Sequence, residues 1–205
     1  MTQPASATER VLPRGLPAPP SDELEPYLDA ATCCVERYGW SRTSTKDIAR
    51  EAGVERTTLY RHLGSKDRIL RLLIAREAHR LIDAAIATAA TVEPGPEVVV
   101  EIVAHSLEYV WGHKALSKLL ADDAELLQGF VTDGLSDTVA RFVDALAPVL
   151  GAAMDAGTLA SRDPAVVIEW LVRVTMTLIV APAPGDPRRF LRTVITPVLE
   201  PRAQR

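Results

Sequence analysis

Aromatic side chains are scarce in this 205-residue chain, where phenylalanine, tyrosine and tryptophan together make up 5% of the residues. Any core must therefore be built mainly from alanine, leucine and valine. Hydrophobic residues nevertheless account for 47% and charged residues for 24%, which are ordinary values for a globular protein and exclude a chain that is disordered throughout. The length allows one large domain or two small ones.

Cysteine is nearly absent, and the two that occur, Cys33 and Cys34, are adjacent. Neighbouring cysteines do not readily bridge each other, so we expect no internal disulfide framework and a reducing compartment. Packing is a simpler role for the pair than a redox switch.

The sequence also lacks the charged start and apolar run of a secretory signal. Its longest hydrophobic stretch, residues 166–184, carries Glu169 and Arg173 midway, which predicts a buried helix rather than a membrane span. We therefore expect a cytoplasmic protein without a membrane partner.

Proline and glycine divide the rest of the chain. Five of the 15 prolines lie in residues 1–20, which have little to bury and are predicted to form a disordered arm. The clearest interior break is the run Glu93-Pro94-Gly95-Pro96.

The segments between the breaks show helical spacing of apolar residues, and neither a strand pattern nor a fixed repeat is found, so the predicted fold class is all-α. The first helix starts between residues 21 and 26 and ends near Gly39. The other expected helices cover about 44–52, 55–63, 65–90, 97–111, 114–121, 124–132, 136–156, 163–181 and 187–199.

Residues 44–63 have the pattern of a helix-turn-helix. Ser44 and Asp47 are spaced as a capping box at a helix start, and Gly53 suits the sharp turn that follows. The outer face of the second helix is basic and hydroxylated with one aromatic ring, which is typical of a major-groove reader. This face carries Arg56, Thr57, Tyr60 and Arg61.

Charge is unevenly distributed. Residues 37–71 contain nine basic and four acidic side chains, a net charge of +5, although the whole chain has a net charge of −4. A basic module on an acidic remainder predicts a DNA-binding segment joined to a part with another task.

The run from Gly39 to Asp67 closely resembles the tetracycline-repressor (TetR) family of bacterial regulators. The resemblance covers about residues 21–81, and beyond them only the helical layout is similar. Glu55 stands where the family usually has a capping Ser or Thr, and Leu63 stands where Phe is usual. The matching residues are Gly39, Thr43-Ser44, Asp47-Ile48-Ala49, Ala52-Gly53-Val54, Thr58-Leu59-Tyr60, His62 and Ser65-Lys66-Asp67.

The resemblance implies about nine helices in two domains. Residues 21–81 would form a three-helix DNA-binding domain, joined by a long helix to a ligand-binding and dimerisation domain at 82–205. A homodimer would form through the helices near 163–181 and 187–199 and bind a double-stranded DNA operator in the bacterial cytoplasm, associated with the nucleoid. The Glu55 carboxylate is expected either to interact favourably with the positive end of the helix dipole or to accept a hydrogen bond from cytosine N4.

The DNA-binding side chains expected from the helix face and from the resemblance are Arg42, Ser44, Thr45, Arg56, Thr57, Thr58, Tyr60, Arg61, His62 and Lys66. Arg56, Thr57 and Arg61 are predicted to reach base edges or nearby backbone. Ser44, Thr45, Tyr60 and Lys66 are predicted to hold phosphates. The alternatives are core positions for Tyr60 and His62 and an ordinary solvated side chain for Lys66.

In the second domain, a few large or pliable side chains stand among many small ones, which predicts a ligand pocket on the order of several hundred Å³. We expect a small hydrophobic ligand with one polar end, met by His105, His113 or Arg173. The alternatives are ordinary helix positions for the histidines, an internal Glu169–Arg173 ion pair and a fully packed core. The expected lining residues are His105, Tyr109, Trp111, His113, Phe130, Phe142, Met154, Trp170, Arg173 and Met176.

Motifs for catalysis are not found: there is no His-Glu-x-x-His, no Cys-x-x-Cys and no Gly-rich phosphate loop. We expect no enzyme, no metal and no cofactor. The predicted function is a ligand-responsive DNA-binding regulator, a repressor released from a near-palindromic operator by a hydrophobic small molecule. A helical lipid-handling protein or a helical enzyme is the alternative, and the basic helix-turn-helix segment argues against both.

Overall fold

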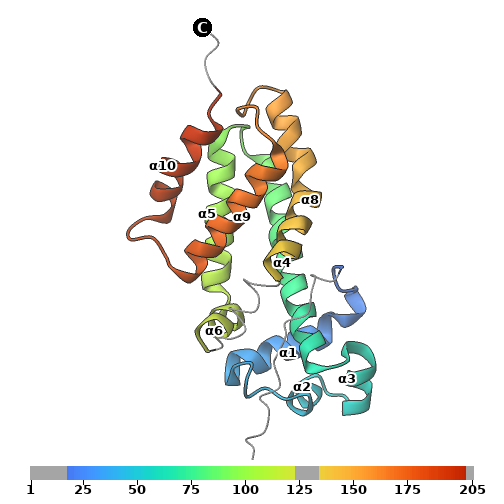
Figure 1. The fold of residues 1–205 in the computed structure, drawn as a ribbon. Coiled ribbons are helices and arrows are strands. Elements are labelled where there is room, and N and C mark those ends of the chain that lie inside the picture. Colours follow the sequence, from blue (N-terminus) through green and yellow to red (C-terminus); the bar gives the residue numbers. More distant parts are fainter. Residues whose placement is uncertain (1–17, 123–133, 202–205) are drawn as a thin grey trace, which may run out of the picture.

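A computed structural model describes residues 18–122 and 134–201, and within these ranges all regular structure is helical, as the sequence predicts (Figure 1). The expected helix over 124–132, with Phe130, lies outside the described residues, as do residues 1–17 of the expected arm. A short 3-10 helix, Asp22–Leu24, comes first. The α-helices are α1 (Glu25–Tyr38), α2 (Thr45–Glu51), α3 (Arg56–Leu63), α4 (Lys66–Thr91), α5 (Pro96–Gly112), α6 (Lys114–Asp122), α8 (Leu135–Asp155), α9 (Pro164–Val180) and α10 (Pro187–Leu199).

Helices α1, α2 and α3 and the start of α4 surround one small core (Figure 1). Its largest side chains come from all four helices and have no exposed surface. They include Leu28, Ile48, Leu59, Leu63 and Ile69. Helix α1 begins at Glu25 and has Pro26 in its first turn, where proline's missing N–H costs nothing.

Helix α4 is 26 residues long and runs on from this core into the upper half of the molecule (Figure 1). It starts where the Ser65 hydroxyl accepts a hydrogen bond from the Arg68 backbone N–H. At 1.5 Å per residue its length is about 39 Å. The predicted domain boundary at residues 81 and 82 therefore falls inside one continuous helix, so both halves of the molecule share a rigid element.

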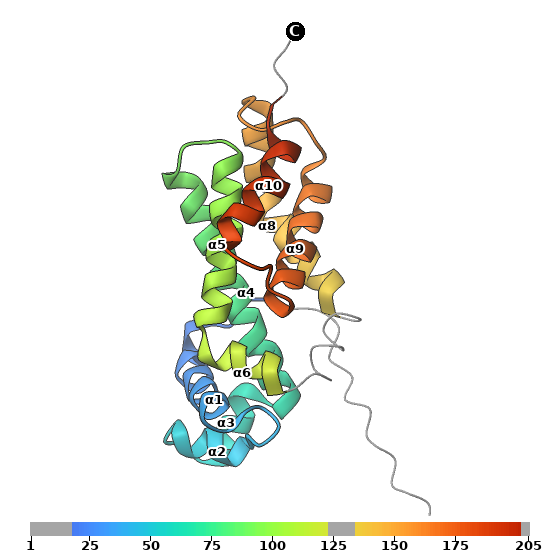
Figure 2. The same ribbon diagram turned by 90° about the vertical axis from the view of Figure 1, so that its left-hand side faces the viewer.

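The upper half is a bundle of the second part of α4 with α5, α8, α9 and α10 (Figure 2). Helix α10 packs along α5, and α8 packs against α9 and α4. Buried Leu107, Leu191 and Ile195 join α5 to α10. Two arginines of α10 also pair with acidic residues of α5: Arg188 with Glu101 and Glu108, and Arg192 with Glu97 and Glu101.

Helix α6 lies beneath α5 and packs against α1 (Figure 2). Its Ala115 and Leu119 belong to the core of α1–α4, so this core is completed by residues from beyond the predicted 21–81 domain. Gly39 ends α1 with φ +77°, a backbone conformation that favours glycine. A Cβ at this position would also meet an Asp122 carboxylate oxygen at 2.9 Å. No helix within the described ranges meets the length and hydropathy needed to cross a membrane.

Candidate functional site

The helix-turn-helix is formed by α2 and α3. The Ser44 Oγ accepts from the Asp47 backbone N–H at 3.2 Å, and an Asp47 carboxylate oxygen accepts from the Ser44 backbone N–H at 3.2 Å, which completes the predicted capping box. The Ser44 hydroxyl also donates to this carboxylate oxygen at 2.6 Å. The hydrogen bonds from the Ser44 hydroxyl and backbone N–H lower the pKa of Asp47 below its ordinary value. Gly53 in the turn has φ +67°, as its position predicts. The Ser44 hydroxyl is therefore engaged in holding the helix start.

The outer face of α3 has the predicted composition. Leu59 and Leu63 point into the core, whereas Arg56, Thr57 and Arg61 are exposed. Tyr60 is 65% exposed, an unusual position for a large aromatic residue. Among the described side chains, none forms an ion pair with Arg56 or Arg61. Exposed arginines without an internal carboxylate partner are available to an anionic ligand.

Other predicted DNA contacts already have partners within the protein. The His62 ring stacks on Tyr27 of α1 with 4.9 Å between ring centroids. The Lys66 ammonium donates to the backbone carbonyl oxygens of Trp40 at 2.7 Å and Ser41 at 3.3 Å, and lies over the Trp40 ring. These contacts fasten the loop before α2 to the start of α4.

The remaining predicted positions surround this loop and the start of α3. Arg42 and Glu55 are exposed, and Thr45 and Thr58 are half-buried. Glu55 is the residue before α3, where it makes no capping hydrogen bond with its side chain. The structure therefore does not replace the missing Ser or Thr cap with a carboxylate cap.

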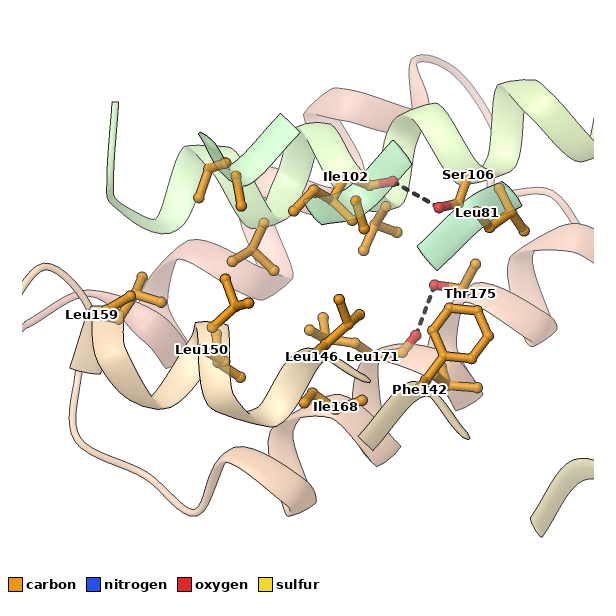
Figure 3. Close-up of a pocket in the computed structure, with 18 of the residues that line it drawn as sticks. Leu81, Ile102, Ser106, Phe142, Leu146, Leu150, Leu159, Ile168, Leu171 and Thr175 are labelled. Carbon is orange, nitrogen blue, oxygen red and sulfur yellow. Dashed lines mark hydrogen bonds between the residues drawn. The ribbon is translucent and has the colours of Figure 1, made fainter. Parts of the chain in front are cut away.

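A cavity of about 400 Å³ lies between α4, α5, α8 and α9, as an apolar ligand site in the second domain requires (Figure 3). Its walls are mostly aliphatic, with Ile102 from α5, Leu146 and Leu150 from α8, and Ile168 and Leu171 from α9. In Figure 3, Leu159 and Leu150 lie toward one end of the space, and Leu81 and Phe142 toward the other. A volume of this size is typical of a site for a small organic ligand.

Among the described residues of the wall, the polar side chains are four that carry hydroxyls: Ser106, Thr138, Thr158 and Thr175. Each donates to a nearby backbone carbonyl oxygen, for example Ser106 to Ile102 at 2.8 Å and Thr175 to Leu171 at 2.7 Å (Figure 3). With their protons used in this way, they offer a ligand only lone pairs. No charged side chain is among the described residues of the wall.

Of the predicted lining residues, the structure places Phe142 and Met176 in the wall. The expected polar anchors do not reach it: His105 is exposed on α5, and His113 follows α5, where its ring accepts a hydrogen bond from the Leu116 N–H. Arg173 pairs with Glu169 at 2.6 Å, but the two side chains are 50% and 46% exposed, so this ion pair is external and not internal. The polar groups at the wall are hydroxyls instead.

Four further predicted residues lie in the described part of the chain but outside the wall. Met154 and Trp170 belong to the packed core of the bundle. Tyr109 hydrogen-bonds to Glu77, and the Trp111 indole N–H donates to the Ile179 carbonyl oxygen at 3.4 Å. Each of these large side chains contacts neighbouring helices. A large side chain stabilises the fold more when it is packed against its neighbours than when it borders empty space.

Sequence reasoning missed most of the aliphatic wall. On α8 the lining positions 142, 146, 149, 150 and 153 repeat every three or four residues, and α9 has a similar series at 168, 171, 172, 175, 176 and 179. This periodicity is visible in the sequence, but a cavity wall and a packed core face have the same pattern. Only the relative placement of the helices distinguishes them.

Comparison with known proteins connects these features. The sequence model described as bacterial regulatory proteins of the tetR family matches residues 28–73, which cover α2, α3, most of α1 and the start of α4. This match supports the assignment of the chain to the TetR family. It is a DNA-binding transcriptional regulator, which agrees with the exposed basic face of α3. An uncharacterized HTH-type transcriptional regulator of Mycobacterium tuberculosis is 27% identical over 177 residues, which span 85% of this chain and 84% of that protein.

Solved structures share the fold of this TetR-family regulator over nearly its whole length. The TetR family repressor AlkX from a Dietzia species, implicated in biodegradation of n-alkanes, is 19% identical with a TM-score of 0.67 and covers 87% of this chain and 94% of its own. The transcriptional regulator FadR from Bacillus subtilis, solved in complex with stearoyl-CoA, is 16% identical with a TM-score of 0.60 and covers 86% and 97%. At these identities the likeness establishes the fold alone.

A buried ionic network joins the two halves of the regulator, and sequence reasoning did not find it. The Arg76 side chain on α4 is only 3% exposed. It donates to Glu25 at 3.1 Å, Asp29 at 2.9 Å and the Thr32 hydroxyl at 2.8 Å, all on α1. Its Nε also donates to neighbouring Glu77 at 2.9 Å. A buried arginine is tolerated here because each of the three guanidinium nitrogens donates to an acceptor.

Glu77 extends this network to α5. Its side chain is 5% exposed and accepts a hydrogen bond from the Tyr109 hydroxyl. Burial raises the pKa of Glu77, but the hydrogen bond from Tyr109 and the charges of Arg76 and Arg80 outweigh it, so the pKa lies below its ordinary value. Burial and the Glu77 carboxylate raise the pKa of Tyr109 to about 12. Helices α1, α4 and α5 are thus connected through hydrogen bonds between charged groups and the neutral Tyr109 hydroxyl.

No group of three or more His, Cys, Asp or Glu side chains suited to a metal ion is found in residues 18–122 and 134–201.

Proposed function

We propose that this TetR-family regulator is a ligand-responsive repressor that binds a near-palindromic operator as a homodimer and is released by a hydrophobic small molecule. The observation that carries the proposal is the apolar cavity of about 400 Å³ bordered by α4, the helix that continues into the helix-turn-helix core. A ligand there contacts the element that positions α3 for DNA.

The proposed DNA contacts are the exposed residues of α3 and the loop before α2. Arg56, Thr57 and Arg61 face away from the core and would read base edges in the major groove. Arg42, Thr45 and Tyr60 would meet phosphates on either side of it. Ser44, Thr58, His62 and Lys66 would contribute from the edge of this surface, with Ser44, His62 and Lys66 chiefly positioning the helices through the contacts described above.

The proposed dimer interface uses α9 and α10. Both helices are buried on one side within the chain and carry apolar side chains on the other, including Val166 and Val180 on α9 and Phe190 and Val198 on α10. A helix that is apolar on two sides needs partners on both, and a four-helix arrangement of two chains supplies the second. Sedimentation at micromolar concentration is expected to give twice the chain mass of 22.3 kDa.

The ligand is proposed to be predominantly hydrophobic, because the wall presents aliphatic groups and hydroxyl lone pairs but no charge. Two structural relatives support a chemistry of this kind: FadR was solved with stearoyl-CoA, and AlkX is implicated in n-alkane biodegradation. Under this proposal, the bound ligand favours an α4 position in which the two recognition helices no longer match successive major grooves.

Selection of bound fragments from the source genome tests the DNA part. The expected result is a set of near-palindromic fragments. Arg56→Ala should then weaken binding to the selected operator by about thirtyfold, or about 2 kcal/mol, and relax base preference at one position. Arg162→Ala, which removes an exposed arginine just before α9, is the matched control and should leave both unchanged. Equal weakening of operator and random duplex by Arg56→Ala would contradict base reading.

A thermal-shift screen of acyl, aromatic and steroid-like compounds tests the ligand part. A true ligand raises the unfolding temperature and releases operator DNA over the same concentration range. Release only by cationic, highly polar or nucleotide compounds would contradict the apolar site and leave the DNA-binding function intact.

A further inference from the structure

A second, smaller cavity of about 160 Å³ lies between α4, α5, α6, α8 and α9. Helix α4 lines both cavities with one continuous face. Leu70, Ile74 and Ala78 border the second cavity, Leu81 borders both, and Ala85 and Ala89 border the main one. These positions repeat every three or four residues, and from Leu70 to Ala89 they extend over about 28 Å of helix.

The two cavities also share their dividing wall. Five residues line both of them: Leu81, Thr138, Phe142, Met176 and Ile179. In Figure 3, Leu81 and Phe142 lie at the end of the main cavity opposite Leu159, so the partition is at one end of an elongated space. Met176 is unbranched, and a side chain of this kind adapts to the shape of a neighbouring group. The residues shared by the two cavities therefore include a side chain that can change its shape.

The two cavities differ in what lies behind their walls. Leu70, Ile74 and Leu119 of the second cavity belong to the core of α1–α4 that holds the helix-turn-helix. None of the described residues that line the main cavity belongs to that core. Glu77, which accepts a hydrogen bond from Arg76 within the network that joins α4 to α1, also borders the second cavity. A molecule confined to the main cavity thus touches none of the side chains in the DNA-binding core, whereas one that enters the second cavity contacts them.

Resting on the proposed ligand-responsive function, we infer that the two cavities form one elongated site for a long, unbranched hydrocarbon chain. The main cavity supplies most of the binding, and the end that passes Phe142 and Met176 into the second cavity produces the release from DNA. The leading end is apolar, because Glu77 borders the second cavity and carries a negative charge that disfavours a carboxylate.

Straight-chain alcohols from hexanol to hexadecanol, delivered as cyclodextrin complexes, test this site in the full-length protein. Two readouts are taken for each alcohol: the rise in unfolding temperature and the release of the genome-selected operator, followed by fluorescence anisotropy. The short alcohols should stabilise the wild-type protein and leave the operator bound even at saturation. The long alcohols should both stabilise the protein and release the operator.

A matched pair of variants on the same face of α4 separates the two cavities. Ala78→Leu fills only the second cavity, and Ala89→Leu fills only the main one; both alanines are partly buried. Ala78→Leu should raise the hexadecanol concentration needed for half-release by about tenfold, which corresponds to about two methylene groups excluded from burial. It should leave stabilisation by octanol unchanged. Ala89→Leu should weaken every chain length.

Leu120→Phe narrows the second cavity from α6 and serves as a second variant if Ala78→Leu impairs folding or operator binding. Full release of the wild-type protein by octanol at saturation, or a chain-length profile unchanged in both second-cavity variants, would overturn the elongated site and leave the proposed function standing. If no alcohol raises the unfolding temperature, both the elongated site and the proposed hydrophobic ligand are wrong.

Discussion

The two halves of the molecule are built from the same kind of side chains, yet they use them differently. In the DNA-binding half, Leu28, Leu59 and Leu63 have no exposed surface and lock three helices together. In the upper half, Leu146, Leu150 and Leu171 are only partly buried and border a cavity of about 400 Å³. A DNA reader needs fixed spacing between its contacts, whereas a sensor needs space that a ligand can fill.

The halves are not independent, because α4 and the network around Arg76 connect them. Close packing beneath α3 means that a movement of α4 displaces the DNA-binding half as a unit. Because the upper part of α4 borders a cavity, a ligand could move it there at a low cost in packing energy. The contrast between the two cores is therefore itself part of the proposed switching.

The largest effect is expected at the connection between the halves. Arg76→Ala should lower the free energy of unfolding by about 4 kcal/mol, because it leaves the carboxylates of Glu25 and Glu77 without their main partner. Arg80→Ala is the control: Arg80 pairs with the same two carboxylates but is 44% exposed, so its loss should cost less than about 1 kcal/mol. Urea denaturation of both variants measures the difference, and equal losses would show that burial of Arg76 is unimportant.

A matched leucine pair compares the two cores directly. Leu59→Ala should cost about 3 kcal/mol, since it opens a hole in a core where the side chain is fully buried. Leu150→Ala should cost about half as much or less, because its side chain already borders empty space and loses fewer contacts. If chemical denaturation gives the same loss for both, the upper core is as tightly packed as the lower one.

Replacing an alanine by leucine should change the free energy of unfolding in opposite directions in the two halves. Ala31→Leu introduces bulk at a position with no exposed surface and should destabilise the protein by about 2 kcal/mol. Ala153→Leu projects into the cavity and should stabilise the protein by about 1 kcal/mol while weakening any hydrophobic ligand. Thermal unfolding with and without ligand measures both effects, and destabilisation by Ala153→Leu would contradict an open cavity.

The smallest change in stability is expected when the pH is lowered. The pKa of Glu77 is lower in the folded protein than its ordinary value, so its charge contributes stability at neutral pH, and this contribution is lost as pH falls through the folded-state value. Glu77→Gln should therefore be less stable than the wild type at pH 7, and the gap should close in the acid range below about pH 4. If the difference in stability between the wild type and Glu77→Gln stays constant down to that pH range, the shape of the side chain rather than its charge causes the difference.

Local signals made the helix-turn-helix predictable. Ser44 and Asp47 form their capping box between residues three apart, and Gly53 adopts its positive φ within a single turn. The outward direction of Arg56, Thr57, Tyr60 and Arg61 follows from α3 itself once Leu59 and Leu63 are buried. Such features depend on residues close in the sequence, so the sequence is sufficient to predict them.

The ligand site was predicted less well, and the reason is physical. The search for large and polar side chains selected Tyr109, Trp111 and Arg173, which the structure shows engaged with Glu77, Ile179 and Glu169. The wall is formed instead by aliphatic residues such as Ile102 and Leu146. A periodic aliphatic face predicts burial, but it does not tell whether the opposite helix lies in contact or across a gap.

By itself the sequence determined the all-α class, the helix-turn-helix at 44–63 and its basic face, because these follow from spacings within one or two helical turns. The motif residues of the same segment carry the resemblance to the TetR family. Only the tertiary structure decided where the cavities lie, how α6 completes the DNA-binding core and how Arg76 of α4 meets Glu25, Asp29 and Thr32 of α1. These features join residues far apart in the sequence, such as Leu70 and Val180 at the second cavity, and their geometry depends on how whole helices pack rather than on any local pattern.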